Sequence, residues 1–367
     1  MIGSTVLPQP TWRADASVAR VMICDDSVVI RTAISRMLET DPTIRVVARA
    51  ANGAAALAEM GRQAIDVIVL DIEMPVMDGL TALPLLLKAD PKVRIIMAST
   101  LTTRGADVAL RALHLGAADY VPKPSTASIQ DDSFRRELLA KVRGLARLRQ
   151  VSQAPAAPRM TAPRGLPLRP ASRVRPNLLA IGSSTGGPQA LFMLIKELGP
   201  GLPVPVVLTQ HMPRTFTPIL ADHLTKLGGM PCHEAVHGER LEPGRIYLAP
   251  GDQHLCIDAI SGVMCARLTG DAPENFCRPS VDPMLQSASV ACAGRVLMVM
   301  LTGMGHDGLA GTRSLIEAGG TALAQDEATC VVWGMPGAIA QAGLCHAILP
   351  LPRLAMKIRE ILEVKVR

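Results

Sequence analysis

Aromatic residues are scarce in this sequence: they make up 2% of 367 residues, although 49% of the residues are hydrophobic. The cores must therefore consist of Ala, Val, Leu, Ile and Met, which suits helices packed against parallel sheets. Long apolar runs are missing too, because no stretch approaches the roughly 18 residues of a membrane span and none near the start resembles a signal peptide. We therefore expect a cytoplasmic protein that does not insert into a membrane.

Paired cysteine motifs are also absent. None of the eight cysteines lies in a CxxC pair, and most have apolar neighbours in the sequence. This spacing favours reduced, buried thiols over a disulfide framework or a zinc site. The eight are Cys24, Cys232, Cys256, Cys265, Cys277, Cys292, Cys330 and Cys345.

Acidic residues are missing from one segment. Between Lys141 and Pro176 the chain has nine Lys or Arg residues and no Asp or Glu. Removing these nine charges from the total of +6 leaves −3 for the remainder, so the basic character belongs to this segment and not to a domain surface. The segment also lacks aromatic residues that could stack on bases, so we interpret it as a solvated linker and expect no nucleic-acid binding.

The same segment divides the chain. Its stretch QAPAAPRMTAPRGLPLRPASRVRP contains six prolines, which favour extended backbone over a packed core. The chain is also too long for one ordinary core. We therefore predict a flexible leader over residues 1–18, a first domain over 19–145, a linker over 146–176 and a second domain over 177–367.

The first domain alternates short apolar stretches with helical patterns. RVMIC precedes SVVIRTAISRMLET, IRVVARA precedes GAAALAEMGRQ, and RIIMAST precedes RGADVALRALHLG, with DVIVLD and ADYVPKP as further apolar stretches. Repeated strand–helix units of this kind predict a parallel sheet with helices on both faces. Ligand sites in such sheets gather at the carboxyl ends of the strands.

Polar residues stand at those strand ends. Asp25 and Asp26 follow the first predicted strand, Asp71 the third, Ser99 the fourth and Lys123 the fifth. Converging carboxylates suit a hard cation such as Mg²⁺, which can bridge to a phosphoryl group. A nearby lysine and hydroxyl could hold the oxygens of that group.

Together with LDIEMPVMDG, MAST and YVPKP, these residues resemble a response-regulator receiver domain over about 19–140. The resemblance implies a flavodoxin-like, five-stranded parallel sheet in the order 2-1-3-4-5. It implies that Asp71 accepts the phosphoryl group and that Mg²⁺ binds to Asp26, Asp71 and the backbone carbonyl of Glu73, with support from Asp25. Ser99, Tyr120 and Lys123 would be the residues that respond to phosphorylation.

The second domain opens with a buried strand, a glycine-rich turn and an amphipathic helix, NLLAIGSSTGGPQALFMLIKEL. The GxxxxG spacing of a P-loop is present, but Pro188 stands where its lysine should be, and GxGxxG is absent. GSSTG instead fits G-x-S-x-G with Ser184 at its centre, a turn that can present a nucleophilic hydroxyl beside backbone donors. A helix cap is the alternative for Ser184, and Ser183 is a rival nucleophile.

Two further strand ends supply partners for a serine. VPVVLTQHMP ends in His211, which could act as a general base, and RVLMVMLTGMGHDG runs into a turn that carries Asp307. A carboxylate there could orient the imidazole and stabilise its charged form. The chain order Ser, His, Asp differs from that of α/β-hydrolases, chymotrypsin and subtilisin.

With IYLAPGDQHL and CRPSVDPM, these motifs resemble the catalytic domain of the CheB family of chemotaxis protein-glutamate methylesterases. The resemblance implies a doubly wound α/β domain in which Ser184, His211 and Asp307 act as nucleophile, base and orienting acid. Backbone N–H groups of Thr185 and Met304 are our candidates for the oxyanion hole. No cofactor is expected at this site.

The resemblance further implies a function and its partners. The substrate would be the γ-methyl ester of glutamate on chemoreceptor helices, with release of methanol and deamidation of specific receptor glutamines. A chemotaxis histidine kinase would supply the phosphoryl group that activates the enzyme, and we expect a monomer. Two alternatives stay open: a receiver-controlled DNA-binding regulator that uses the basic segment, and a scaffold that has lost catalysis.

Overall fold

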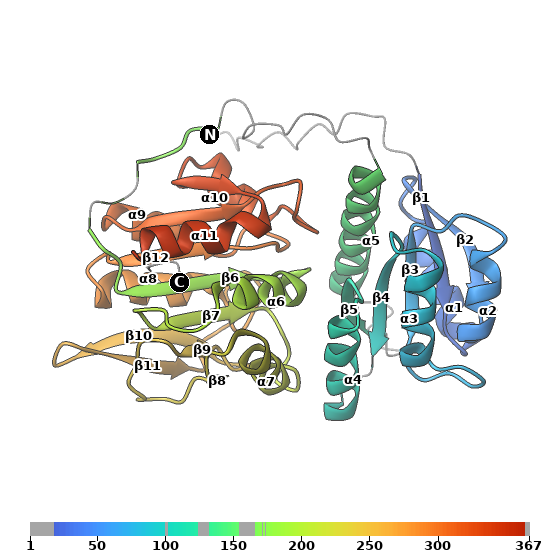
Figure 1. Ribbon diagram of the computed structural model, residues 1–367, viewed down its shortest axis with the longest axis horizontal. Coiled ribbons are helices and arrows are strands. Elements are labelled where there is room, and N and C mark those ends of the chain that lie inside the picture. Colours follow the sequence, from blue (N-terminus) through green and yellow to red (C-terminus); the bar gives the residue numbers. More distant parts are fainter. Residues whose placement is uncertain are drawn as a thin grey trace, which may run out of the picture.

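The computed structural model describes residues 18–99, 102–123, 132–153, 166–170, 172 and 174–363, and it forms two α/β domains (Figure 1). Residues 1–17 of the predicted leader and residues 154–165 of the predicted linker lie outside the described part of the chain. All eight cysteines are free, and seven of them are buried. Among the described helices, none has both the length and the apolar character needed to span a bilayer.

The first domain contains the predicted parallel sheet in the order β2-β1-β3-β4-β5. Helices cover both faces of this sheet, so its central strands consist of nearly continuous apolar residues. In β3, for example, every residue of VIVLD is buried. The strands are β1 (Ala19–Cys24), β2 (Ile44–Ala50), β3 (Val67–Asp71), β4 (Arg94–Ser99) and β5 (Asp119–Pro122).

The described residues of this domain form five helices: α1 (Val28–Leu38), α2 (Gly53–Met60), α3 (Gly79–Ala89), α4 (Thr103–His114) and α5 (Asp132–Gln153). Helix α3 contains Pro84, which masks the helical pattern in the sequence. It forms nonetheless because the Asp78 side chain caps its first turn, and because Leu83 and Leu86 are buried while Pro84 faces outward. Helix α5 continues to Gln153, so the domain boundary predicted at residue 145 falls inside a helix.

The second domain is built on a seven-stranded parallel sheet in the order β14-β13-β12-β6-β7-β9-β8, beside an antiparallel hairpin of β10 and β11. The sheet strands are β6 (Leu178–Ser183), β7 (Val206–Gln210), β8 (Cys232–Glu234), β9 (Ile246–Leu248), β12 (Val296–Met300), β13 (Thr321–Gln325) and β14 (Ala347–Leu349). The hairpin strands are β10 (His254–Ile260) and β11 (Val263–Thr269). The helices are α6 (Gly187–Leu198), α7 (Thr217–Gly228), α8 (Val281–Ala291), α9 (Leu309–Glu317), α10 (Met335–Gln341) and α11 (Leu351–Ile361).

The two domains meet through the α4–β5–α5 side of the first one (Figure 1). The rings of Tyr120 at β5 and Phe216 before α7 stack with centroids 4.7 Å apart. Arg147 on α5 donates hydrogen bonds of 2.8 Å to the carbonyls of Glu327 and Cys330. This contact places the first domain against the edge of the second sheet at which β6 ends.

Candidate active site

Three neighbouring strands of the second sheet bring the predicted catalytic residues together. Strand β6 pairs with β12 on one side and with β7 on the other. Ser184 follows β6 directly, His211 follows β7 directly, and Asp307 lies in the turn between β12 and α9. Since the strands are parallel, all three residues lie at the carboxyl edge of the sheet, where an α/β domain binds its ligands.

Asp307 contacts His211 and is held by a dense set of donors. Its Oδ2 lies 2.7 Å from Nε2 of His211, and its side chain is 2% exposed. The other donors are Ser280 Oγ (2.6 Å), Val281 N (2.6 Å), Gly308 N (2.9 Å), Asn275 Nδ2 (3.0 Å) and Asp282 N (3.2 Å). Burial alone would raise the pKa of Asp307, but these hydrogen bonds hold it below its usual range, so the carboxylate is charged.

The charge of Asp307 acts in turn on His211. Burial disfavours the imidazolium, but the hydrogen bond with Asp307, supported by one with Cys277, raises the pKa of His211 above its ordinary value of 6.5. Because Nε2 is hydrogen-bonded to Asp307, a proton transfer between His211 and a serine would use Nδ1. This is the arrangement in which a carboxylate orients a base and stabilises its charged form.

The two candidate nucleophiles have different surroundings. Ser183 is fully buried, and its hydroxyl donates to Oε1 of Gln210 over 2.7 Å. Ser184 is half-buried, and its hydroxyl has no hydrogen-bond partner within the described parts of the chain. No hydrogen bond joins Ser184 to His211 among these residues, which is common before substrate binds. Ser184 is therefore the more accessible of the two serines.

Backbone donors lie around Ser184. Its own N–H donates to the carbonyl of Thr302 over 3.0 Å, which ties the turn after β6 to the turn after β12. Gly303 comes so close to Ser184 that an added Cβ would lie 3.0 Å from the serine Cβ, so a side chain there would crowd the site. Of the described residues, none accepts a hydrogen bond from the amides of Thr185 or Met304, the two predicted oxyanion donors.

Sequence reasoning missed several residues that hold this site. Asn275 bonds both Asp307 and Asp282 over 3.0 Å, and Cys277 contacts His211. Both lie in the loop between β11 and α8, and only tertiary structure brings that loop to the triad. Its neighbour CRPSVDPM could have indicated the place, because it begins at Cys277 and supplies further donors to Asp307.

The first domain has its own cluster of charges at the carboxyl edge of its sheet. Oxygens of Asp25, Asp26 and Asp71 lie within 4.8 Å of one another. Lys123 Nζ lies 2.6 Å from Asp71 Oδ2 and 3.8 Å from Asp25 Oδ2. Burial raises the pKa of Asp71 to about 6, against the opposing effect of Lys123. Such oxygens, one of them the buried Asp25 Oδ2 without a hydrogen bond in the described structure, fit a divalent cation.

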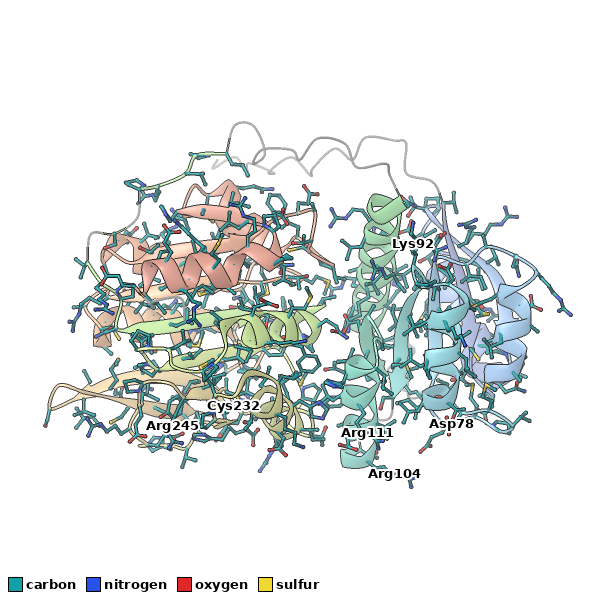
Figure 2. All side chains as sticks on the ribbon, in the orientation of Figure 1. Asp78, Lys92, Arg104, Arg111, Cys232 and Arg245 are labelled. Carbon is teal, nitrogen blue, oxygen red and sulfur yellow. The ribbon has the colours of Figure 1, made fainter. Side chains whose placement is uncertain are left out.

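The remaining predicted residues of this cluster lie around Asp71. The backbone N–H of Glu73 donates to Asp71 Oδ1 over 3.2 Å, which brings the backbone at Glu73 beside the cluster. Ser99 lies with Arg104 along a small cavity beside Asp71, and its hydroxyl donates to the carbonyl of Gly105 over 2.7 Å. Figure 2 shows Arg104 and Asp78 at the same end of the domain. Tyr120, by contrast, is buried in the contact between the domains.

Comparisons with known proteins place each of the two domains in a family. Residues 179–358 match the family model of the CheB methylesterase, and residues 21–132 match that of the response regulator receiver domain. A protein-glutamate methylesterase/protein-glutamine glutaminase of Azospirillum brasilense is 52% identical over 96% of this chain and 94% of its own length. A relative of the same name from a group 2 operon of Rhodospirillum centenum is 51% identical, over 98% of this chain and 97% of its own.

A solved structure resembles the second domain. The catalytic domain of the Thermotoga maritima CheB methylesterase aligns with a TM-score of 0.50 at 38% identity. The alignment covers 52% of this chain and all of that domain.

Proposed function

We propose that this chain, which belongs to the CheB methylesterase family, hydrolyses glutamate γ-methyl esters on chemoreceptors and deamidates specific receptor glutamines under the control of its receiver domain. The protein is a hydrolase of the protein-glutamate methylesterase/protein-glutamine glutaminase type. The observation that carries the assignment of residues is the convergence of three adjacent strand ends on the hydrogen-bonded pair His211 and Asp307, beside the accessible Ser184.

The proposed reaction uses Ser184 as the nucleophile. Its oxygen attacks the ester carbonyl while His211 takes the hydroxyl proton on Nδ1, and Asp307 stabilises the resulting imidazolium. Collapse of the tetrahedral intermediate breaks the bond to the methoxy group, which leaves as methanol with the proton from His211. Water, deprotonated by His211, then attacks the acyl-enzyme, and glutamate and the serine hydroxyl are regenerated. A glutamine amide would follow the same steps and release ammonia.

The unpaired amides of Thr185 and Met304 support an oxyanion hole at the serine. Both residues lie in turns that the Ser184–Thr302 backbone hydrogen bond holds together. Fixed N–H donors of this kind stabilise the negative charge that develops on the carbonyl oxygen during attack. They require no cofactor.

Control would come from the receiver domain. Asp71 would accept a phosphoryl group from a chemotaxis histidine kinase, and Mg²⁺ held by Asp26, Asp71 and the carbonyl of Glu73 would neutralise the oxygens of that group, with support from Asp25. Lys123 and Ser99 would hold the phosphoryl oxygens. Because the same domain contacts the edge of the catalytic sheet, a change at Asp71 could alter access to the serine. We place the enzyme in the cytoplasm as a monomer.

The test identifies the nucleophilic residue and the reaction in the same experiment. A serine-directed phosphonate should form one adduct, on the peptide that contains Ser184, and should abolish methanol release from a methylated receptor fragment. Ser184→Ala should prevent both the adduct and the release. An adduct on Ser183 would move the nucleophile by one residue, whereas absence of any adduct together with absence of methanol would favour a scaffold that has lost catalysis.

A further inference from the structure

Phe276 is fully exposed beside the catalytic pair. Its relative exposure is 101%, whereas the other three phenylalanines of the chain, Phe134, Phe192 and Phe216, are at most 6% exposed. An exposed phenylalanine is unusual in a chain with so few aromatic residues, because burial of a phenylalanine side chain stabilises the folded protein. Single exposed apolar residues are common, so exposure alone does not indicate a function for Phe276; its position beside the catalytic pair does.

The loop that presents Phe276 is fastened to the triad on both sides of the ring. Asn275, the residue before it, donates to Asp307 Oδ1 over 3.0 Å, and Cys277, the residue after it, contacts His211. Glu274 and Cys277 close the turn with reciprocal backbone hydrogen bonds of 3.1 and 2.9 Å. The backbone at Phe276 is therefore held within one residue of two contacts to the catalytic pair.

The backbone of this turn is strained at Asn275 and Phe276. Asn275 and Phe276 have φ values of 53° and 64°, in the left-handed region that a bulky side chain rarely adopts. Strain of this kind persists where the surroundings hold it, and it concentrates at functional sites. Here the anchors are the contacts of Asn275 to Asp307 and to Asp282.

The position of Phe276 beside the proposed catalytic site indicates which molecule could contact its ring. A protein segment that brings its ester carbonyl to Ser184 would pass beside the turns that carry His211 and Asp307. Phe276 lies between the two residues that contact this pair. Met304, whose amide is a proposed oxyanion donor, is 36% exposed and adds apolar surface at the turn of Asp307. The ring remains fully exposed while the receiver domain is in contact with the catalytic domain, so the receiver itself does not cover it.

We propose that Phe276 is a docking residue for the protein substrate, and that it packs against an apolar side chain about one helical turn from the modified glutamate. Side chains three or four residues apart lie on one helix face, so one can enter the site while the other covers the ring. The inference rests on the proposed function, because the occupant is the substrate helix of that reaction. It adds a residue that selects protein substrates without touching the reacting atoms.

The test compares Phe276→Ala with Val290→Ala, which removes another exposed apolar side chain, 83% exposed near the end of α8. Methanol release would be followed as a function of the concentration of methylated receptor fragment, and phosphonate labelling of Ser184 would report on the site itself. Phe276→Ala should raise KM about tenfold, with kcat and the labelling rate close to those of the unsubstituted enzyme. Phe276→Leu should recover most of the affinity, and Val290→Ala should resemble the unsubstituted enzyme.

Three results would overturn the proposal. An unchanged KM in Phe276→Ala would mean that the ring does not contact the substrate. Equal losses in kcat and labelling rate would mean that the side chain supports the triad and does not dock a substrate. Absence of methanol release by the unsubstituted enzyme, with normal labelling, would instead refute the methylesterase proposal and the docking role with it.

Discussion

The carboxylate of Asp119, at the start of β5 in the receiver domain, accepts a hydrogen bond of 3.0 Å from the backbone N–H of Gly186, two residues after Ser184. Asp119 is 1% exposed, and it also lies 3.5 Å from the buried ammonium of Lys141. The receiver domain thus places a polar group at the turn that carries the proposed nucleophile. Gln189, on the first turn of α6, adds a hydrogen bond of 2.5 Å to the receiver carbonyl of Ala117.

The first prediction concerns this contact. Asp119→Asn should raise methanol release in the absence of a phosphodonor by severalfold and should reduce the stimulation that a phosphodonor gives, because the contact to Gly186 is weakened. Lys141 keeps Glu137 as an ion-pair partner at 2.7 Å, so its charge stays compensated. Asp258→Asn, at a half-exposed carboxylate in β10 that pairs with Arg267, serves as the control. If Asp119→Asn left the unstimulated rate of methanol release unchanged, the contact between Asp119 and Gly186 would have no part in regulation.

The second prediction is that Ser184 and His211 act together in one catalytic step. Ser184→Ala and His211→Ala should each lower kcat by about 10⁴-fold or more, and the double variant should be little worse than either, because both residues act in one step. Ser183→Ala should keep most of the turnover, since its hydroxyl is buried against Gln210. Additive losses in the double variant, measured by methanol release at saturating substrate, would contradict a shared step.

The third prediction concerns pH. Burial lowers the pKa of His211, but the hydrogen bond to Asp307 outweighs it, so the imidazole loses its proton at a higher pH than an ordinary histidine. Asp307→Asn should therefore shift the titration midpoint of His211, followed by NMR of the ring nitrogens, toward lower pH. Glu239→Gln, which alters the carboxylate beside His233, should leave His211 where it was. If Asp307→Asn did not shift the titration midpoint of His211, the Asp307 carboxylate would not be the group that raises the pKa of His211.

The strand-end residues could be predicted because they follow from local patterns. A buried apolar run predicts a strand, parallel strands end at one edge, and polar residues placed directly after the runs must meet there. This reasoning predicted that Ser184 and His211 lie at one edge of the second sheet and that Asp71 lies at an edge of the first, which is where the structure has them. The receiver resemblance also implied the observed strand order of the first sheet.

Other features depend on contacts that the sequence does not encode locally. Pro84 hid helix α3, whose stability comes from a capping aspartate and buried leucines. Asn275 lies 32 residues before Asp307 in the chain, and Asp119 lies 67 residues before Gly186. No periodicity or motif within one segment reports a pairing of that kind, so these two side chains became visible only in the folded protein.

One measurement tests the central claim most directly: methanol release from a methylated receptor fragment, with Mg²⁺, before and after addition of a small-molecule phosphodonor. The account predicts release by the unsubstituted enzyme that rises with the donor, and release by Asp71→Asn that stays at the unstimulated rate. Absence of methanol in every condition would contradict the proposed reaction. Stimulation that survives in Asp71→Asn would contradict the assignment of Asp71 as the residue through which the receiver controls Ser184.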